Sequence, residues 1–294
     1  MARAPKQVEP TSLSATRTPA LLLAPLALAP VTAPAQSRLD WEAHAVVANV
    51  YHWRGIRRAD GFVLQPDAWL RLRRGRATFS AGAWANVELS THRDSSLSDL
   101  RPGHWGPSEA DLWLQAATRL GGIDGAAGAI LYHWIGEQRR HGTEEVYARL
   151  RLPAVYAAPA LSAWVDLNRV RGSYWEATAA VPLFANPLPA PRLAFYLETA
   201  AGFSTGQHRP PLTGLPRVTF ARDGLTHIDL ALGARLAWSL GGGLALLLNP
   251  AFHLQVSADS TAKRTSLRAL GAWKDVRPWL ALQLGFGRAR RGDP

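Results

Sequence analysis

Apolar and polar residues alternate with a period of two over most of the chain. Between residues 226 and 240 the even positions from Ile228 onward are apolar, whereas the odd positions carry His227, Asp229 and Arg235 among small residues. Residues 244–257 repeat the pattern after three glycines. Successive side chains of a strand point to opposite faces, so the two runs predict a hairpin of strands about twice the length usual in soluble proteins.

The same alternation recurs in ten further segments, and no segment shows the 3.6-residue period of an amphipathic helix. The sequence therefore predicts twelve strands. The further segments are 41–52, 62–73, 76–90, 109–119, 123–135, 143–152, 160–168, 173–182, 192–203 and 278–287.

The predicted connections alternate between long and short for most of the chain. Short connections, at Arg74-Gly75, Leu120–Gly122 and Gly241–Gly243, separate the long ones. The long connections are 53–61, 91–108, 204–223 and 258–277. The middle of the chain departs from this pattern, because 169–172 is short and 183–191 is long. Short turns at one end and long loops at the other are typical of an up-and-down transmembrane barrel.

Strands that are apolar on one face and polar on the other suit a barrel in a bilayer. Lipid offers the backbone no hydrogen bonds, so strands can span it only in a closed sheet. We therefore expect an all-β fold, an up-and-down antiparallel transmembrane β-barrel of about twelve strands, with ten or fourteen as the alternatives. Tryptophans near strand ends fit an aromatic belt at the membrane interface, namely Trp41, Trp53, Trp238 and Trp279.

The first 35 residues have the layout of a secretory signal peptide. Arg3, Lys6 and Arg17 precede an apolar stretch, and Ala33-Pro34-Ala35 matches an A-x-A cleavage site. A disordered Pro/Ala-rich tail is the alternative. We expect residues 1–35 to be removed and residues 36–294 to form the barrel domain.

The composition excludes some classes of function. The chain has no cysteine, which excludes disulfides and thiolate metal sites. Loss of residues 1–35 removes three basic residues and one glutamate and lowers the formal charge from +11 to +9. The basic residues are scattered over strand ends and loops without a nucleic-acid motif, so no nucleic-acid partner is expected.

Several short motifs resemble the TorF-like porins, a family of exported bacterial proteins. The first is Tyr51-x-Trp53-Arg54-Gly55-Ile56 followed by Leu64-Gln65-Pro66. The segments 165–177, 201–207 and 223–233 are similar to the hairpin and strand-end segments of the same family. The resemblance spans most of residues 40–287 and implies an outer-membrane β-barrel without a defined substrate.

Charged residues on the polar face of the strands are the candidates for a pore lining. Inside a barrel, rings of charge set ion selectivity. The alternative is an internal network of paired charges that fills a narrow barrel. The candidates are Asp67, Arg71, Glu88, Asp111, Glu145, Arg149, Asp166, Glu198, Asp229 and Arg235.

A basic cluster in the first predicted loop is a candidate surface for anions. Arg54, Arg57 and Arg58 lie in the segment expected to connect the first two strands. They would attract anions or contact lipopolysaccharide phosphates there. Ordinary solvated loop charge is the alternative.

The sequence shows no convincing catalytic, metal or cofactor site. His253 and Ser257 lie four residues apart on one strand face, about 13 Å, which is too far for a nucleophile and its base. His227 and Asp229 share a face without an accompanying serine. We expect no enzyme activity, no metal and no cofactor.

We therefore expect a bacterial outer-membrane porin for passive passage of small hydrophilic solutes or ions, with anions slightly favoured. Expected partners are outer-membrane lipid, small solutes or ions, and the barrel-assembly machinery during insertion. The first alternative is a closed structural or adhesion barrel that binds through loops 91–108 and 204–223. The second is a lipid-modifying barrel enzyme.

Overall fold

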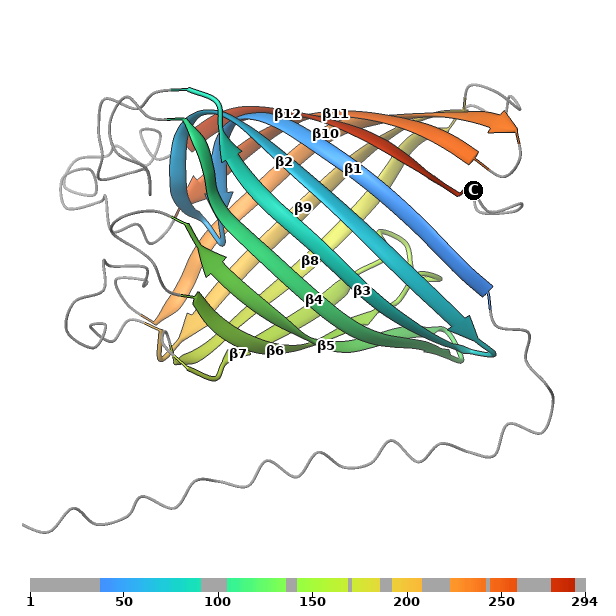
Figure 1. The fold of residues 1–294 in the computed structure, drawn as a ribbon, viewed down its shortest axis with the longest axis horizontal. Helices are drawn as coiled ribbons and strands as arrows, with labels where there is room; N and C mark the ends of the chain where they lie inside the picture. Colours follow the sequence, from blue (N-terminus) through green and yellow to red (C-terminus); the bar gives the residue numbers. More distant parts are fainter. Residues whose placement is uncertain are drawn as a thin grey trace, which may run out of the picture. The chain divides into compact units, whose positions relative to one another are not determined.

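Twelve antiparallel strands make up the part of the chain that the structure describes (Figure 1). The structure, a computed structural model, describes residues 38–90, 105–135, 142–168, 171–185, 192–207, 223–241, 244–257 and 276–288. The predicted signal peptide, residues 1–35, lies outside these ranges. The strands are β1 (Arg38–Trp53), β2 (Ile56–Arg74), β3 (Ala77–Glu88), β4 (Gly106–Leu120), β5 (Ile123–Trp134), β6 (Gly142–Arg151), β7 (Ala160–Asp166), β8 (Gly172–Ala185), β9 (Arg192–Thr205), β10 (Gly224–Gly241), β11 (Leu244–Ser257) and β12 (Val276–Arg288).

The strands form one closed barrel in which each strand pairs with its neighbours in sequence. Closure is made by β1 and β12, which pair in register from Glu42 opposite Gly287 to Ala48 opposite Ala281. A closed sheet leaves no open edge, so the backbone groups of the wall are paired inside the barrel itself. The prediction of an up-and-down antiparallel barrel of twelve strands is confirmed.

The outer face of the barrel is apolar, the reverse of a water-soluble protein. Leu70, Leu114 and Leu232 are 56%, 66% and 51% exposed, and they occupy the apolar positions of the alternation. Charged residues at the other positions are enclosed, and Glu88 and Glu145 are each 1% exposed. A wall that shows its large hydrophobic side chains to the outside requires lipid around it. The fold is therefore a transmembrane β-barrel.

The interior is less polar than the alternation suggests. Tyr132, Trp134 and Ile130 form a buried cluster on β5, and the inward rings of Trp113, Tyr147 and Trp164 pack against it. Farther around the wall, the rings of Trp69 and Trp113 stack with centroids 5.3 Å apart. Aromatic side chains therefore occupy part of the space that the sequence suggested was open and charged.

The connections differ between the two ends of the barrel. Residues 75–76 and 121–122 are tight turns at one end, here called the turn end. The opposite end, the loop end, carries the longer predicted loops, whose residues 91–104, 208–222 and 258–275 lie outside the described ranges. The predicted loop 53–61 is wrong, because β1 and β2 continue through it and leave only residues 54–55 as a turn.

The position of the apolar face gives a direct test of membrane insertion. Leu114→Arg places a charge on the outer face near the middle of β4, and we expect a loss of about 2–4 kcal/mol of folding free energy in lipid vesicles. The matched variant Gln115→Arg puts the same charge on the inner face. Denaturant titrations of the vesicle-embedded protein, followed by tryptophan fluorescence, measure the folding free energy of both variants. Equal losses for the two variants would contradict the assignment of the faces.

Candidate functional site

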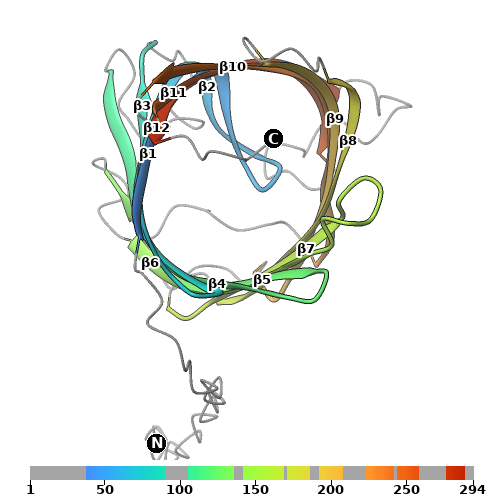
Figure 2. The same ribbon diagram turned by 90° about the vertical axis from the view of Figure 1, so that its right-hand side faces the viewer.

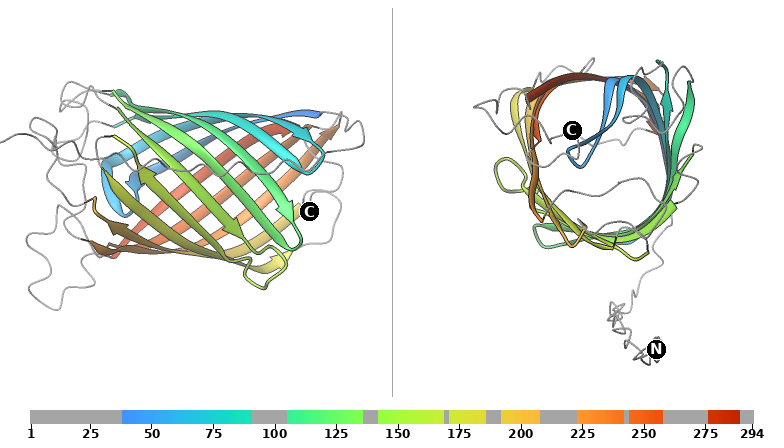
Figure 3. Two further views of the ribbon diagram at one scale, coloured as in Figure 1. Left: turned by 90° about the horizontal axis from the view of Figure 1, so that it is seen from below. Right: turned by 90° about the vertical axis from the view of Figure 1, so that its left-hand side faces the viewer.

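The hairpin of β1 and β2 leaves the barrel wall and enters the lumen. The pairing of β1 with β12 ends at Ala48, and the pairing of β2 with β3 begins at Val63. Within residues 50–60 the two strands pair with each other and not with the wall, and the register shifts between Ala48 and Val50 and between Tyr51 and His52. Such irregularities bend a strand. The end of this segment, here called the inner hairpin (residues 49–62), is seen inside the ring of strands from both ends (Figures 2 and 3).

The turn of the inner hairpin fits closely against the opposite wall. Arg54 and Gly55 have φ angles of 52° and 83°, the signs found at both central residues of a type I′ turn. A Cβ at Gly55 would lie 2.6 Å from the Cβ of His227 on β10, so only glycine fits this contact. Arg54 has no such freedom and keeps a backbone conformation that costs energy for residues with a side chain.

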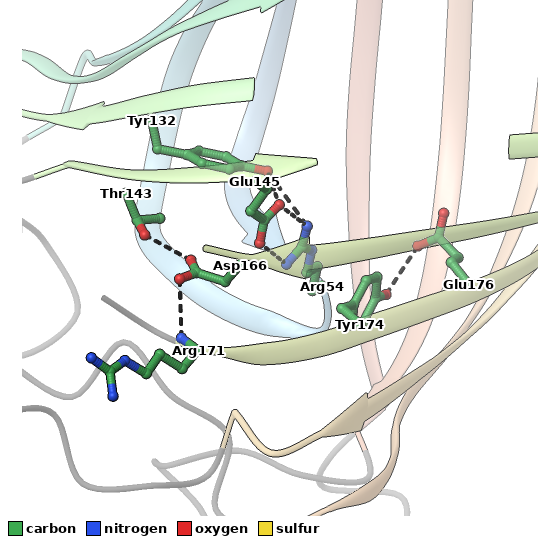
Figure 4. A network of polar contacts seen from close by, with 8 residues as sticks. All are labelled: Arg54, Tyr132, Thr143, Glu145, Asp166, Arg171, Tyr174 and Glu176. Carbon is green, nitrogen blue, oxygen red and sulfur yellow. Dashed lines mark hydrogen bonds and ion pairs between the residues drawn. The ribbon is translucent and has the colours of Figure 1, made fainter. Parts of the chain in front are cut away.

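Arg54 carries the main contact of the inner hairpin with the wall (Figure 4). Its two terminal nitrogens donate to the two carboxylate oxygens of Glu145 on β6, at 2.7 and 2.5 Å. Both side chains are enclosed, with exposures of 7% and 1%. The Tyr132 hydroxyl donates to the same carboxylate at 2.9 Å. A bidentate pair of this kind is stronger and more directional than a single charge-assisted hydrogen bond.

Three aromatic rings surround the same guanidinium group. The Arg54 Cζ lies 4.6 Å from the ring centroid of Trp53, 5.2 Å from that of Trp164 and 4.4 Å from that of Tyr174. Trp164 and Tyr174 belong to β7 and β8, whereas Trp53 comes from the inner hairpin. We name the four wall residues the guanidinium cage: Tyr132, Glu145, Trp164 and Tyr174.

A second arginine holds the base of the inner hairpin. Arg58 lies 4.0 Å from Glu109 on β4, and its guanidinium faces the ring of Trp134 at 5.6 Å. Tyr51 and Trp134 each donate to the Glu109 carboxylate at 3.0 Å. The buried Glu109 carboxylate thus accepts hydrogen bonds from both the hairpin and the wall. A charge that is removed from water requires such partners.

The turn half of the lumen contains a cavity of about 400 Å³. Three arginines, Arg149, Arg151 and Arg235, contribute to its lining with two carboxylates, Glu198 and Asp229. Asp229 also lies 2.9 Å from the Nδ1 of His253, which faces the same cavity. The arginines and carboxylates of the lining together carry a formal charge of +1. The volume of the cavity equals roughly that of a dozen water molecules at about 30 Å³ each.

The ten predicted pore-lining residues fall into three groups. Four line the open cavity or its rim, and two pair with a neighbour on the wall of β1 and β2. The rest are buried toward the loop end. The cavity group consists of Arg149, Glu198, Asp229 and Arg235. The paired group consists of Asp67, which lies beside His44, and Arg71, which lies beside Glu42. The buried group consists of Glu88, Asp111, Glu145 and Asp166. That they line a path for solutes stays a prediction.

The basic cluster of the first predicted loop is placed differently by the structure. The side chains of Arg54 and Arg58 are 7% and 5% exposed and lie inside the barrel. The strands continue through this segment, so neither arginine lies in a solvated loop. The predicted loop position, on which a contact with anions or lipopolysaccharide depended, is therefore wrong for Arg54 and Arg58. The side chain of Arg57 lies outside the described part of the structure. Trp53 is likewise an inward residue over Arg54 and not part of an interfacial belt.

Sequence reasoning missed the cage and the inner hairpin. Tyr132, Trp164 and Tyr174 sit at the inward positions of their strands, where the alternation favours polar residues. Aromatic residues at these inward positions are the one signal in the sequence from which a filled interior could have been predicted. Their meeting with Arg54 depends on a segment 78 to 120 residues away in sequence, which no local pattern shows.

The histidines considered for catalysis have other neighbours. His227 stacks on the ring of Tyr174 at 6.4 Å and lies 4.0 Å from Glu176. The side chain of Ser257, the predicted neighbour of His253, is outside the described residues. Within the described ranges, no group of three or more histidine and acidic side chains is arranged to hold a metal ion. Nor do those ranges hold a helix long and apolar enough to cross a membrane.

Comparison with known proteins gives similarity of fold only. No family model and no curated protein matches the sequence. The COG4313 outer membrane channel from Pseudomonas putida F1 matches at 11% identity and a TM-score of 0.46, covering 88% of this chain and 99% of that one. The NanC porin matches at 8% identity and a TM-score of 0.44, covering 85% of this chain and 100% of that one. LpxR from Salmonella typhimurium matches at 9% identity and a TM-score of 0.46, covering 83% of this chain and 99% of that one.

Loss of the Arg54–Glu145 pair is expected to release the inner hairpin. Trypsin cannot enter the lumen, so the folded protein in detergent should resist cleavage after Arg54 and Arg58 for as long as the inner hairpin stays inside the barrel. Glu145→Gln leaves a buried guanidinium without its counter-charge, a change that costs about 3–5 kcal/mol. We expect cleavage at these bonds, read by mass spectrometry, to rise by roughly tenfold or more.

Glu198→Gln is the matched control, because Glu198 is an exposed carboxylate of the cavity lining. This variant should remain as resistant as the unmodified protein. If both variants resist cleavage equally, the ion pair is not what holds the hairpin.

Proposed function

We propose that the protein is an outer-membrane channel for passive passage of small hydrophilic solutes. The observation that carries the proposal is the polar cavity of about 400 Å³ inside a closed barrel whose outside is apolar. A hydrated space enclosed by a lipid-facing wall offers a polar solute a route that the hydrocarbon does not. The proposal includes no catalytic step and no cofactor.

The charge of the cavity favours anions. Arg149, Arg151 and Arg235 outnumber the two carboxylates of the lining, and one of these carboxylates is close to His253. In a narrow space with low-dielectric walls, a small excess of one charge raises the local concentration of counter-ions. Small anions are therefore the solutes that this half of the lumen favours.

The type of barrel and two features of the sequence support the proposed placement in a bacterial outer membrane. Residues 1–35 have the layout of an export signal, and several strand motifs resemble the TorF-like porins. Barrels of up-and-down strands with long loops at one end are the outer-membrane type. Outer-membrane lipid, solutes or ions, and the machinery that inserts barrels are the partners that this proposal includes.

A closed structural or adhesion barrel is the second candidate, and the inner hairpin favours it. Arg54 and Arg58 fasten the hairpin to Glu145 on β6 and Glu109 on β4, inside the loop half of the lumen. A lumen fastened in this way carries little current, and binding would then fall to the predicted loops 91–108 and 204–223. Electrical recording of the purified protein in planar bilayers separates the two candidates.

The channel proposal predicts stepwise currents whose selectivity depends on the cavity arginines. In a tenfold gradient of KCl the reversal potential should indicate a preference for chloride. Replacing Arg149 and Arg235 together by glutamine removes two positive charges from the lining, so the preference should shift toward potassium.

Arg74→Gln is the control, because Arg74 lies exposed at the turn between β2 and β3. It should leave the reversal potential unchanged. An equal shift in both variants would mean that the cavity is not on the conduction path. Silent membranes at high protein concentration would favour the closed barrel.

A further inference from the structure

The guanidinium cage is built on the barrel wall, independently of the residue that fills it. Its members come from four consecutive strands, β5 to β8. Trp164 and Tyr174 are directly opposite each other in the register of β7 and β8. Glu145 is opposite Asp166, whose carboxylate accepts from the Thr143 hydroxyl at 2.7 Å and from the Arg171 backbone N–H at 3.0 Å (Figure 4). Strand pairing therefore fixes the cage geometry.

The chemistry of the cage selects a guanidinium group. Its carboxylate takes two parallel N–H bonds, which match the planar fork of a guanidinium and not the compact head of an ammonium. The faces of Trp164 and Tyr174 lie 5.2 and 4.4 Å from the guanidinium carbon, within the range of cation–π attraction. The Tyr132 hydroxyl lies 3.5 Å from one Arg54 nitrogen and orients the carboxylate.

The present occupant sits on an element that can leave without breaking the wall. Apart from one hydrogen bond from the Leu89 N–H to the Phe62 carbonyl at 2.8 Å, residues 49–62 form backbone ladders only with each other, so withdrawal of the hairpin preserves those ladders. Arg54 also keeps a positive φ of 52°, which is unfavourable for a residue with a side chain. Backbone strain at a residue with a specific contact is typical of functional sites.

We propose that the guanidinium cage is a binding site for guanidinium compounds, which Arg54 occupies as an internal ligand. A guanidinium-bearing solute competes with Arg54 for Glu145 and the two rings. When the solute binds, the inner hairpin is released from the far wall, and the loop half of the lumen opens.

The binding site itself does not rest on the proposed channel function, whereas the opening of the lumen does. An attached side chain acts at a high effective concentration, in the millimolar range for flexible tethers. A free solute must therefore be supplied well above this range to compete with Arg54 in the unmodified protein. In a variant without the Arg54 side chain, lower concentrations suffice.

The first experiment measures binding to the emptied cage in detergent, without any need for conduction. Tryptophan fluorescence of Arg54→Ala is titrated with methylguanidinium chloride and, in parallel, with methylammonium chloride at equal ionic strength. We expect saturable binding of methylguanidinium at least about fivefold tighter than that of methylammonium. Adding Trp164→Phe should reduce the signal, and adding Glu145→Gln should weaken binding by about tenfold or more.

Equal effects of the two cations, or unchanged binding in the Arg54→Ala, Glu145→Gln double variant, would overturn the proposal. The double variant is expected to fold because both members of the buried pair lose their charge together.

The second experiment uses the unmodified protein and guards against misfolding of the variant. Methylguanidinium at several hundred millimolar should accelerate tryptic cleavage after Arg58 relative to methylammonium, because it displaces the inner hairpin. Identical cleavage rates in the two salts would contradict displacement.

Bilayer currents then connect the site to the channel. If methylguanidinium increases the conductance of the unmodified protein, the cage controls the lumen. If both detergent assays succeed and no current is ever seen, the channel proposal fails while the guanidinium site stands.

Discussion

Closure of the sheet is the constraint on which the rest of the structure depends. Lipid cannot hydrogen-bond a strand edge, so β1 and β12 must meet, and they do so over Glu42–Ala48. Beyond Ala48 the first strand turns away from the wall, and the inner hairpin pairs with itself. At this point the Asn49 side chain accepts the Leu280 N–H at 3.0 Å, which gives a donor of β12 a partner where the wall strand has left. The barrel thus releases a segment into its lumen, and the Asn49 side chain pairs one of the backbone donors that the strand leaves behind.

The two halves of the lumen have opposite character. Toward the loop end, the buried carboxylates of Glu109 and Glu145 hold two arginines of the inner hairpin among aromatic rings. Toward the turn end, Arg149, Arg151 and Arg235 face an open cavity. A charge enclosed by protein must be paired, whereas a charge in a hydrated cavity need not be. In the acidic half the inner hairpin therefore supplies arginines to Glu109 and Glu145, whereas the arginines of the basic half border the cavity.

Local patterns predicted the wall well and its interior poorly. The twelve strands and their outward faces followed from residues such as Leu114 and Leu232, because contact with lipid requires an apolar side chain at every second position. The turns at 75–76 and 121–122 were also predicted, since glycine lies in each. The segment 53–61 was mistaken for a loop because its arginines look solvated in sequence, while their partners are on β4 to β8.

By itself the sequence determined that the chain forms a closed, lipid-facing barrel and which side chains of the wall strands point inward. The reason is that alternation is a local property, set by the two-residue period of a strand and by the solvent on each face. Only the tertiary structure decided that Arg54 meets Glu145, that Gly55 packs on His227, and that the cavity remains open beside Arg235. The two contacts join strands that are not neighbours in the barrel, and the curvature of the closed wall, not any spacing along the chain, brings them together.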